Sequence, residues 1–334
     1  MDAGANLACY GPAVPLRRRT NAITAAQFFE LAYGRAPSAD EQALLDRLVV
    51  SVSSASDARA VLLAFDQQQL PTTFQVRLGD DDLALASLDG FRLWLDRRDV
   101  SVSAVILDRQ RWEPHIEAVL RDVLRPGDTF VDVGANVGYH TFLAASLVGA
   151  SGRVVAFEPD AENCRLLWLS RAENGFDHVT IVPNALDRTA GLRYLATHLG
   201  SNGGLVETEL DAVRRGRGVF VQAQPLDDLV DGPVRLMKVD VEGAELSVLA
   251  GAGRLLGDRE AAPDLVLEFS VEMTQRVSGV DPGPAIQQLL DDYGYRLSIL
   301  DRDQPGRRHP YPSAAALLAD WGDPLRIEDL LFER

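Results

Sequence analysis

The stretch TFVDVGANVGYHT, residues 129–141, constrains the fold of this chain more than any other. Thr129–Val133 is β-branched and aromatic, as in a buried parallel strand, and Gly138–Leu147 has the length and the Ala/Leu content of a helix. Gly134 permits a sharp turn between them, and Gly138 allows helix and strand to pack closely. The sequence therefore predicts a strand–turn–helix unit whose free backbone N–H groups suit a carboxylate or a phosphate.

The spacing of the glycines discriminates between ligands. A dinucleotide fingerprint reads G-x-G-x-x-G, and its middle glycine makes room for a pyrophosphate. Asn136 takes that position here, which suits a ligand without a bulky diphosphate at the turn. Asp132 is placed to hold an ammonium group, and Glu158 ends a second strand pattern, Arg153–Asp160, where an acid binds both hydroxyls of an adenosine ribose. Together these features favour S-adenosylmethionine over a nicotinamide cofactor.

Four segments resemble the FkbM-type methyltransferase family: GDTFVDVGANVGYHT, VVAFEPD, NALDRTAG and MKVDVEGAELSVLAG, in this order. They span residues 126–256, and the KVDVEGAE part is the most specific of them. One departure lies in NALDRTAG, because the family usually has a glycine between Leu186 and Asp187. The resemblance implies a methyltransferase that takes its methyl group from S-adenosylmethionine.

Alternating strand and helix patterns predict a doubly wound α/β fold over residues 119–334, a seven-stranded Rossmann-like sheet of the class I methyltransferase type. Asp160 is the expected cap of a helix that ends at Gly175. HVTIVPNAL, VRLMKVD and DLVLEFS supply the third to fifth strands, and VEGAELSVLAGAGRLL reads as one helix. After a helix over Pro284–Tyr293, YRLSIL and RIEDLLFER close the sheet, the last strand running antiparallel as is typical of the class.

Ligands of such sheets bind at the carboxyl ends of the strands. We therefore expect the cofactor to lie against residues at the strand ends and in the turns that follow. These residues are Asp132, Gly134, Asn136, Gly138, Tyr139, Glu158, Pro159, Asn184, Ala185 and Asp240.

A hydroxyl acceptor needs a residue that takes its proton, whereas the sulfonium of the cofactor already activates the methyl group. Asp240 is the best-placed candidate for this general base. The alternatives are Lys238, Glu242, Glu268 and His140. No spacing of His and Cys indicates zinc, and we predict no resident metal, although carboxylates such as Asp240 suit Mg²⁺.

Each candidate base also has a purely structural interpretation. Glu242 and the nearby Glu245 would complement the N-terminus of a helix. Lys238 could be a surface charge, and His140 could simply pack in the first turn of its helix.

The first part of the chain predicts two segments ahead of the catalytic fold. Residues 1–20 are rich in small residues and read as a flexible leader. Residues 21–70 predict a module of about three helices, acting either as a packing or homodimerisation appendage or as a module that binds a protein partner. Its FFELAYGRAP stretch resembles short helical modules that accompany bacterial surface and glycan-related proteins.

Residues 71–118 predict a β-hairpin or small meander that leads into the fold and contributes to the site, with strands at Phe74–Leu78 and Phe91–Leu95. Trp112 and Glu113 precede the next helix. The family resemblance implies an aromatic residue and an acid here that approach the cofactor or the acceptor. The structural alternative makes Trp112 a core anchor and Glu113 a charge at the helix start.

The segment Tyr194–Phe220 reads as a long irregular insertion, with three arginines at 214, 215 and 217. Long loops beside an α/β site often contact the acceptor, and a solvated loop is the alternative.

Composition excludes some partners. A net charge of −16 and a pI of about 4.7 argue against nucleic acid as the acceptor. Cys9 and Cys164 lie far apart in the sequence, so no disulfide framework is indicated. The chain has no apolar run of about 20 residues that could span a membrane and no signal pattern, and we expect a cytoplasmic protein.

The sequence thus predicts an S-adenosylmethionine-dependent O-methyltransferase that acts on a hydroxyl of a sugar, glycan or secondary metabolite. Two alternatives belong to other classes. A nicotinamide-dependent oxidoreductase is disfavoured by Asn136 and by the lack of a Tyr-x-x-x-Lys pair. A non-catalytic cofactor-fold protein would bind a partner through the helical module.

Overall fold

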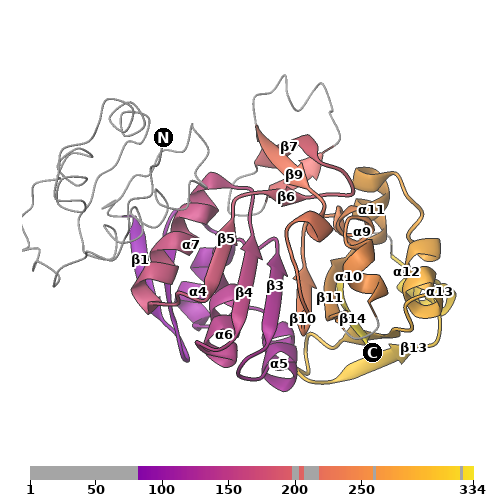
Figure 1. Cartoon of the computed structure of the whole chain (residues 1–334), viewed down its shortest axis with the longest axis horizontal. Coiled ribbons are helices and arrows are strands. Elements are labelled where there is room, and N and C mark those ends of the chain that lie inside the picture. Colours follow the sequence, from indigo (N-terminus) through magenta and orange to yellow (C-terminus); the bar gives the residue numbers. More distant parts are fainter. Residues whose placement is uncertain (1–81, 198–202, 207–217, 259–260, 324–325) are drawn as a thin grey trace, which may run out of the picture. The chain divides into compact units, whose positions relative to one another are not determined.

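The computed structural model describes residues 82–197, 203–206, 218–258, 261–323 and 326–334 (Figure 1). The chain divides into two compact units, Met1–Leu83 and Ala84–Arg334, and the second is described here. The predicted leader, the helical module, the strand Phe74–Leu78 and the three arginines at 214, 215 and 217 lie outside the described residues.

A mixed eight-stranded sheet forms the centre of this unit, in the order β13-β12-β14-β11-β10-β3-β4-β5. Its strands are β3 (Thr129–Val133), β4 (Arg153–Phe157), β5 (Val179–Val182), β10 (Leu236–Val239), β11 (Asp264–Phe269), β12 (Arg296–Leu300), β13 (Arg308–Tyr311) and β14 (Glu328–Glu333). The strands β11, β10, β3, β4 and β5 run parallel to one another, and β14 is antiparallel to both β11 and β12.

The predicted parallel, doubly wound sheet and its antiparallel last strand are therefore present. The predicted count of seven strands is one too low, because β13 pairs antiparallel with β12 at the edge of the sheet. Its sequence RHPY carries neither alternation nor an apolar run, so it forms a strand only by pairing with its neighbour.

Helices cover both faces of the sheet, since consecutive residues of β3 and β4 are buried. They are α4 (Val102–Arg109), α5 (Pro114–Val123), α6 (Tyr139–Val148), α7 (Ala161–Asn174), α9 (Glu245–Ala250), α10 (Gly253–Gly257), α11 (Val271–Ser278), α12 (Pro282–Asp291) and α13 (Ala314–Trp321), with a 3₁₀ turn at Leu226–Asp228. The predicted cap of α7 is confirmed, because the Asp160 carboxylate accepts hydrogen bonds from the N–H groups of Glu162 and Asn163. Gly175 ends that helix in the left-handed conformation.

The helix predicted to follow β10 is two short helices instead, α9 and α10, and it begins at Glu245 rather than Val241. The close approach of two glycines to other backbone segments explains the difference. Gly243 has a φ of +100°, and a Cβ there would lie 2.7 Å from the carbonyl oxygen of Met273. A Cβ on Gly251 would lie 2.5 Å from the carbonyl oxygen of Asp187. Tertiary packing therefore fixes a turn where the sequence pattern continues as a helix.

The predicted irregular insertion is partly a second sheet. Its strands are β6 (Ala185–Leu186), β7 (Gly191–Thr197), β8 (Gly203–Val206) and β9 (Gly218–Gln224), in the order β6-β9-β7-β8. Because β6 begins three residues after β5 ends, this sheet starts at the carboxyl end of the main sheet, as Figure 1 shows. The strands of this sheet are separated in the sequence by a polar, glycine-containing stretch. No local pattern therefore indicated that they pair.

The β-rich segment before the catalytic fold contains the hairpin β1 (Leu83–Ser87) and β2 (Arg92–Asp96). The strand predicted at Phe91–Leu95 is confirmed with a shift of one residue, and its described partner is Leu83–Ser87. Among the described residues no helix has both the length and the apolar character that crossing a membrane requires.

Candidate active site

A pocket opens at the carboxyl ends of β3, β4 and β10, beside the small sheet. Most of the site residues predicted from the sequence line it: Gly134, Asn136, Tyr139, His140, Glu158, Pro159, Asn184, Ala185, Lys238, Asp240, Glu242 and Glu268. Two that do not are Asp132 and Gly138. We call the part around Gly134, Asn136, Glu158 and Pro159 the Glu158 end. The part around Lys238, Asp240, Glu268, Glu113 and His140 is the Lys238 end.

The turn after β3 is shaped by the approach of a neighbouring strand. Gly134 has a φ of +80°, and a Cβ on it would lie 1.9 Å from the carbonyl oxygen of Asp240. The N–H groups of Gly134 and Ala135 both donate to the carbonyl of Phe157. Only glycine allows the end of β10 to come this close to the turn. This backbone contact explains why the position requires a glycine.

Glu158 is buried, and its carboxylate is held by the backbone. Its Oε2 accepts a hydrogen bond from the N–H of Asn136 at 2.7 Å, and its Oε1 accepts one from the N–H of Asp160 at 2.8 Å. Burial, and then the charge of Asp160, raise the pKa of Glu158 to about 8. The carboxyl thus faces the pocket in a fixed orientation, with lone pairs left for further donors.

Asn184 lies between the main sheet and the small sheet. Its Nδ2 donates to Oε1 of Gln224 on β9 at 2.6 Å, and Asn184 and Ala185 line the pocket. Asp187, in the segment that departs from the family pattern, is paired with Arg193 of β7. The β5–β6 connection therefore ties the insertion to the pocket wall.

Asp132 was predicted to contact the cofactor, but it does not line the pocket. Its side chain is 1% exposed and lies behind the pocket, where Oδ2 accepts a hydrogen bond from Thr141 Oγ1 at 2.6 Å. Gly138 also lies outside the lining, and a Cβ on it would be 2.5 Å from Leu167 of α7. Both residues support the packing of α6 instead of lining the pocket.

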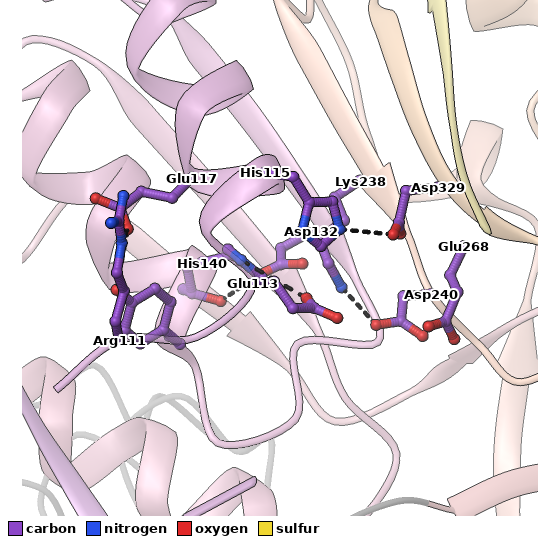
Figure 2. A network of polar contacts seen from close by, with 12 residues as sticks. Arg111, Glu113, His115, Glu117, Asp132, His140, Lys238, Asp240, Glu268 and Asp329 are labelled. Atoms are coloured by element: carbon purple, nitrogen blue, oxygen red, sulfur yellow. Dashed lines mark hydrogen bonds and ion pairs between the residues drawn. The ribbon is translucent and has the colours of Figure 1, made fainter. Parts of the chain in front are cut away.

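Lys238 and Asp240 form the centre of the Lys238 end (Figure 2). The ammonium of Lys238 is 2.8 Å from Oδ2 of Asp240, and the lysine side chain is 4% exposed. Burial acts to lower the pKa of Lys238, but the charges of Asp240, Asp132 and Glu113 raise it above its usual value. Lys238 is therefore a buried cation, not the surface charge considered above.

Glu268 enters the same end from β11. The charge of Asp240, and then burial, raise the pKa of Glu268 well above its usual value, so this carboxyl is protonated at neutral pH. Arg302 lies 3.6 Å from Glu268 and 2.8 Å from Asp329.

Glu113 and His140 complete the Lys238 end. Glu113 precedes α5 with a φ of +43°, and His140, in the first turn of α6, is 5% exposed. Both line the pocket together with the half-buried Trp112. Burial, and then the charges of Lys238 and His115, lower the pKa of His140 well below its usual value, so its imidazole is neutral.

The turn after β10 brings Glu242 to the pocket while Glu245 stays behind it. Glu242 has a φ of +55° and is not part of a helix. Oε1 of Glu245 accepts hydrogen bonds from the N–H groups of Val241 and Gly243, as the structural interpretation of Glu245 expects at the start of a helix.

One buried contact beside the site has no signal in the sequence. Nε2 of His115, on α5, lies 2.7 Å from Oδ2 of Asp329, on β14, across 214 positions of sequence. Arg302 shares the same carboxylate oxygen. No local pattern connects such distant positions. In the described part of the chain, no three His, Cys, Asp or Glu side chains are arranged to hold a metal ion.

Residues 132–297 match the family model described as the Methyltransferase FkbM domain. A curated relative, protein-L-isoaspartate O-methyltransferase 2 of Archaeoglobus fulgidus, is 35% identical over 74 residues, which are 21% of this chain and 32% of that protein. The chain thus matches about a third of the length of this relative.

Two solved structures are similar at low identity. Methyltransferase FkbM from Methylobacillus flagellatus has a TM-score of 0.38 and 20% identity over 65% of this chain and 50% of that one. A SAM-dependent O-methyltransferase from Thermotoga maritima has a TM-score of 0.37 and 16% identity over 68% of each chain. At these scores neither structure bears on what this chain binds.

Proposed function

The chain belongs to the FkbM methyltransferase family, and from this premise we propose that it is an S-adenosylmethionine-dependent O-methyltransferase. Its acceptor is a hydroxyl group of a sugar, a glycan or a secondary metabolite.

The orientation of Glu158 is the observation that carries this proposal. Its carboxylate is fixed by two backbone N–H groups at the end of β4, beside the turn after β3, and it faces the pocket. A buried carboxylate with free lone pairs suits two adjacent hydroxyl donors, such as those of a ribose. Asn136 in place of the middle glycine suits a ligand without a diphosphate at the turn.

The donor supplies a methyl group that its sulfonium already activates. The residues of the chain then have three tasks: to hold the donor, to align an acceptor and to accept a proton. The Glu158 end performs the first task through Glu158 and the backbone of the turn after β3. The Lys238 end performs the other two, because its carboxyl groups and His140 lie in the same pocket.

The charge balance of the Lys238 end supports an uncharged acceptor. Asp240 is paired with Lys238, and Glu268 is protonated at neutral pH. Burial also raises the pKa of Glu113, although Lys238 opposes this shift. Because Asp240 is thus paired and Glu268 protonated, these two acids attract a cation weakly at neutral pH, which favours a hydroxyl over an ammonium group.

Calorimetric titration tests the cofactor. S-Adenosylmethionine and S-adenosylhomocysteine should bind the wild-type protein with micromolar affinity, whereas NADH should not bind. Glu158→Ala should weaken both adenosyl ligands about 10- to 100-fold, since it removes a charged hydrogen-bond acceptor worth about 1.5–3 kcal/mol. Glu162→Ala is the control, because that side chain is 60% exposed and paired with Arg165. Tight binding of NADH and of neither adenosyl ligand would refute the proposal.

A second assay tests the acceptor class. Transfer of labelled methyl from S-adenosylmethionine should be followed with methyl glycosides and phenolic natural products, and in parallel with amino sugars and carboxylic acids. We expect product only with free hydroxyls. Transfer to the amines or to the acids alone would contradict O-methylation while leaving the methyltransferase assignment intact.

A further inference from the structure

Glu113 and His140 share an unusual feature at the Lys238 end. Oε2 of Glu113 and Nε2 of His140 are both buried, and neither has a hydrogen-bond partner in the described part of the chain. The two atoms lie 3.8 Å apart, which is too far for a hydrogen bond between them (Figure 2). Both side chains line the pocket, and the two atoms lie in its wall with almost no accessible surface.

Leaving two such groups unpaired is unfavourable. A buried polar group without a partner costs about 1–3 kcal/mol. Glu113 also has a φ of +43°, a conformation that costs a residue other than glycine about 1–2 kcal/mol. Asn136 and Glu242, which line the same pocket, have positive φ values as well. Strained and unsatisfied residues that gather at one pocket are typical of a functional site.

Three other acids near this pocket already have partners. Asp240 accepts a hydrogen bond from Lys238, and Asp329 accepts from His115 and Arg302. Glu158 accepts from two backbone N–H groups. Asp240, the best candidate from the sequence, would have to give up part of its pairing with a buried lysine to accept a proton. Glu113 Oε2 has no such partner to give up.

The 3.8 Å between the two atoms suits a shared oxygen atom. After a side-chain shift that exposes both atoms, an oxygen about 2.8 Å from each would sit in a bent arrangement between Oε2 and Nε2. A hydroxyl group can donate to the carboxylate and also interact with the neutral imidazole, whereas an ammonium group can only donate.

We propose that Glu113 and His140 form the subsite for the reacting hydroxyl of the acceptor, and that Glu113 takes the proton. This inference rests on the proposed function. As the acceptor oxygen forms its bond to the methyl carbon, the electrons of the carbon–sulfur bond return to sulfur and leave a neutral thioether. The hydroxyl proton passes to Oε2 of Glu113, and His140 holds the oxygen in line. Glu113 is thus the catalytic base, and His140 is a second residue in contact with the acceptor.

The charged groups around Glu113 fit this role. Lys238, Asp240 and Glu268 face it from β10 and β11. Asp329 from β14 and Arg302, which contacts Glu268, also act on its charge, and His140 faces it from α6. Burial raises the pKa of Glu113, Lys238 lowers it, and Asp240 raises it again. A carboxyl whose pKa is moved towards neutrality is suited to accept and release a proton.

Sinefungin tests this subsite without knowledge of the acceptor. This analogue of S-adenosylmethionine carries an amine on the carbon that replaces the methylsulfonium, so its ammonium occupies the place of the transferred methyl. S-Adenosylhomocysteine has only a thioether there. Both should be titrated by calorimetry at pH 8 into the wild type, Glu113→Gln and Glu242→Gln.

If Glu113 faces the transferred methyl, sinefungin should bind the wild type about tenfold more tightly than S-adenosylhomocysteine. Glu113→Gln should abolish this preference and change the affinity for S-adenosylhomocysteine less than about threefold. Glu242→Gln, which removes a different carboxyl from the same pocket, should keep most of the preference. Equal affinities in the wild type, or an equal loss of preference in both variants, would overturn the inference. Failure of S-adenosylhomocysteine to bind the wild type would instead refute the proposed function on which it rests.

A measurement on the unaltered protein covers the case that Glu113→Gln does not fold. Histidine labelled with ¹³C at Cε1 gives one NMR signal per ring, and His140→Phe identifies the signal of His140. Sinefungin should shift this signal in the wild type beyond the shift caused by S-adenosylhomocysteine, while the signal of His309, which lies outside the pocket, stays unchanged. A His140 signal that responds identically to both ligands would contradict the subsite.

Discussion

The two ends of the pocket are built on different principles. At the Glu158 end, both carboxylate oxygens of the central acid are held by backbone N–H groups, and Gly134 lets β10 approach the turn. At the Lys238 end, side chains at the ends of β10 and β11 interact with one another, and two buried atoms, Oε2 of Glu113 and Nε2 of His140, stay unpaired.

Under the proposed function, the difference separates binding of the methyl donor from the reaction with the acceptor. An end fixed by the backbone has one arrangement, which suits a ligand that is the same in every turnover. An end built from coupled titratable groups can change its protonation state, which a proton transfer requires. Four substitutions or conditions test this division, beginning with the largest expected effect.

Lys238→Met should have the largest effect on stability. It removes the buried cation that pairs with Asp240, whose side chain is 25% exposed, and breaking a pair costs at most about 3–5 kcal/mol when both partners are buried. Urea denaturation should show this loss in the free energy of unfolding. Arg92→Met is the control, since it removes an exposed pair with Glu173 and should cost no more than about 1 kcal/mol. Equal losses in the two variants would show that Lys238 does not hold the acidic end together.

Gly134→Ala should follow, because it affects both stability and binding. The added Cβ would lie 1.9 Å from the carbonyl oxygen of Asp240, so β10 or the turn must move. We expect a loss of more than about 2 kcal/mol in the free energy of unfolding and no measurable binding of S-adenosylhomocysteine. Gly149→Ala is a matched control with a φ of +63° and nothing within 4 Å of the added Cβ. Gly149→Ala should cost about 1–2 kcal/mol of stability and leave binding intact. Loss of binding in Gly149→Ala would show that the contact between residue 134 and Asp240 does not explain the effect of Gly134→Ala.

Glu158→Gln should act on binding and leave the Lys238 end unchanged. The amide keeps the shape of the side chain but loses the charge, so the affinity for S-adenosylhomocysteine should fall about tenfold. In the same titrations the ratio of sinefungin to S-adenosylhomocysteine affinities should stay at its wild-type value. A change in that ratio would mean that the two ends of the pocket are coupled.

The pH dependence of binding should be the smallest effect. The free protein holds a proton on Glu158 below a pKa of about 8, whereas ribose hydroxyls donate best to the ionised carboxylate. Ligand binding therefore releases a proton, and the affinity for S-adenosylhomocysteine should rise several-fold from pH 6.5 to pH 8.5. Calorimetry in buffers of different ionisation enthalpy measures the released proton. The same pH dependence in Glu158→Gln would assign the proton to another group.

The sequence itself determined the features that depend on neighbouring residues. A β-branched run, a glycine turn and an Ala/Leu-rich segment produced β3 and α6 with the expected bounds to within one residue. Glu158 and Asp240 follow their strands directly, so the carboxyl ends of a parallel sheet bring them to one edge. Lys238 and Asp240 are two positions apart, and the period of a strand points both the same way.

Tertiary structure decided the rest. Strand alternation and the packing of α6 turned Asp132 away from the pocket and towards Thr141. The backbone approaches at Gly243 and Gly251 divided one predicted helix into two. Glu113 and His140 meet across 27 positions, and His115 and Asp329 across 214, with no periodic pattern to link them. Local propensity acts over a few residues, whereas these contacts exist only once the sheet has brought distant segments together.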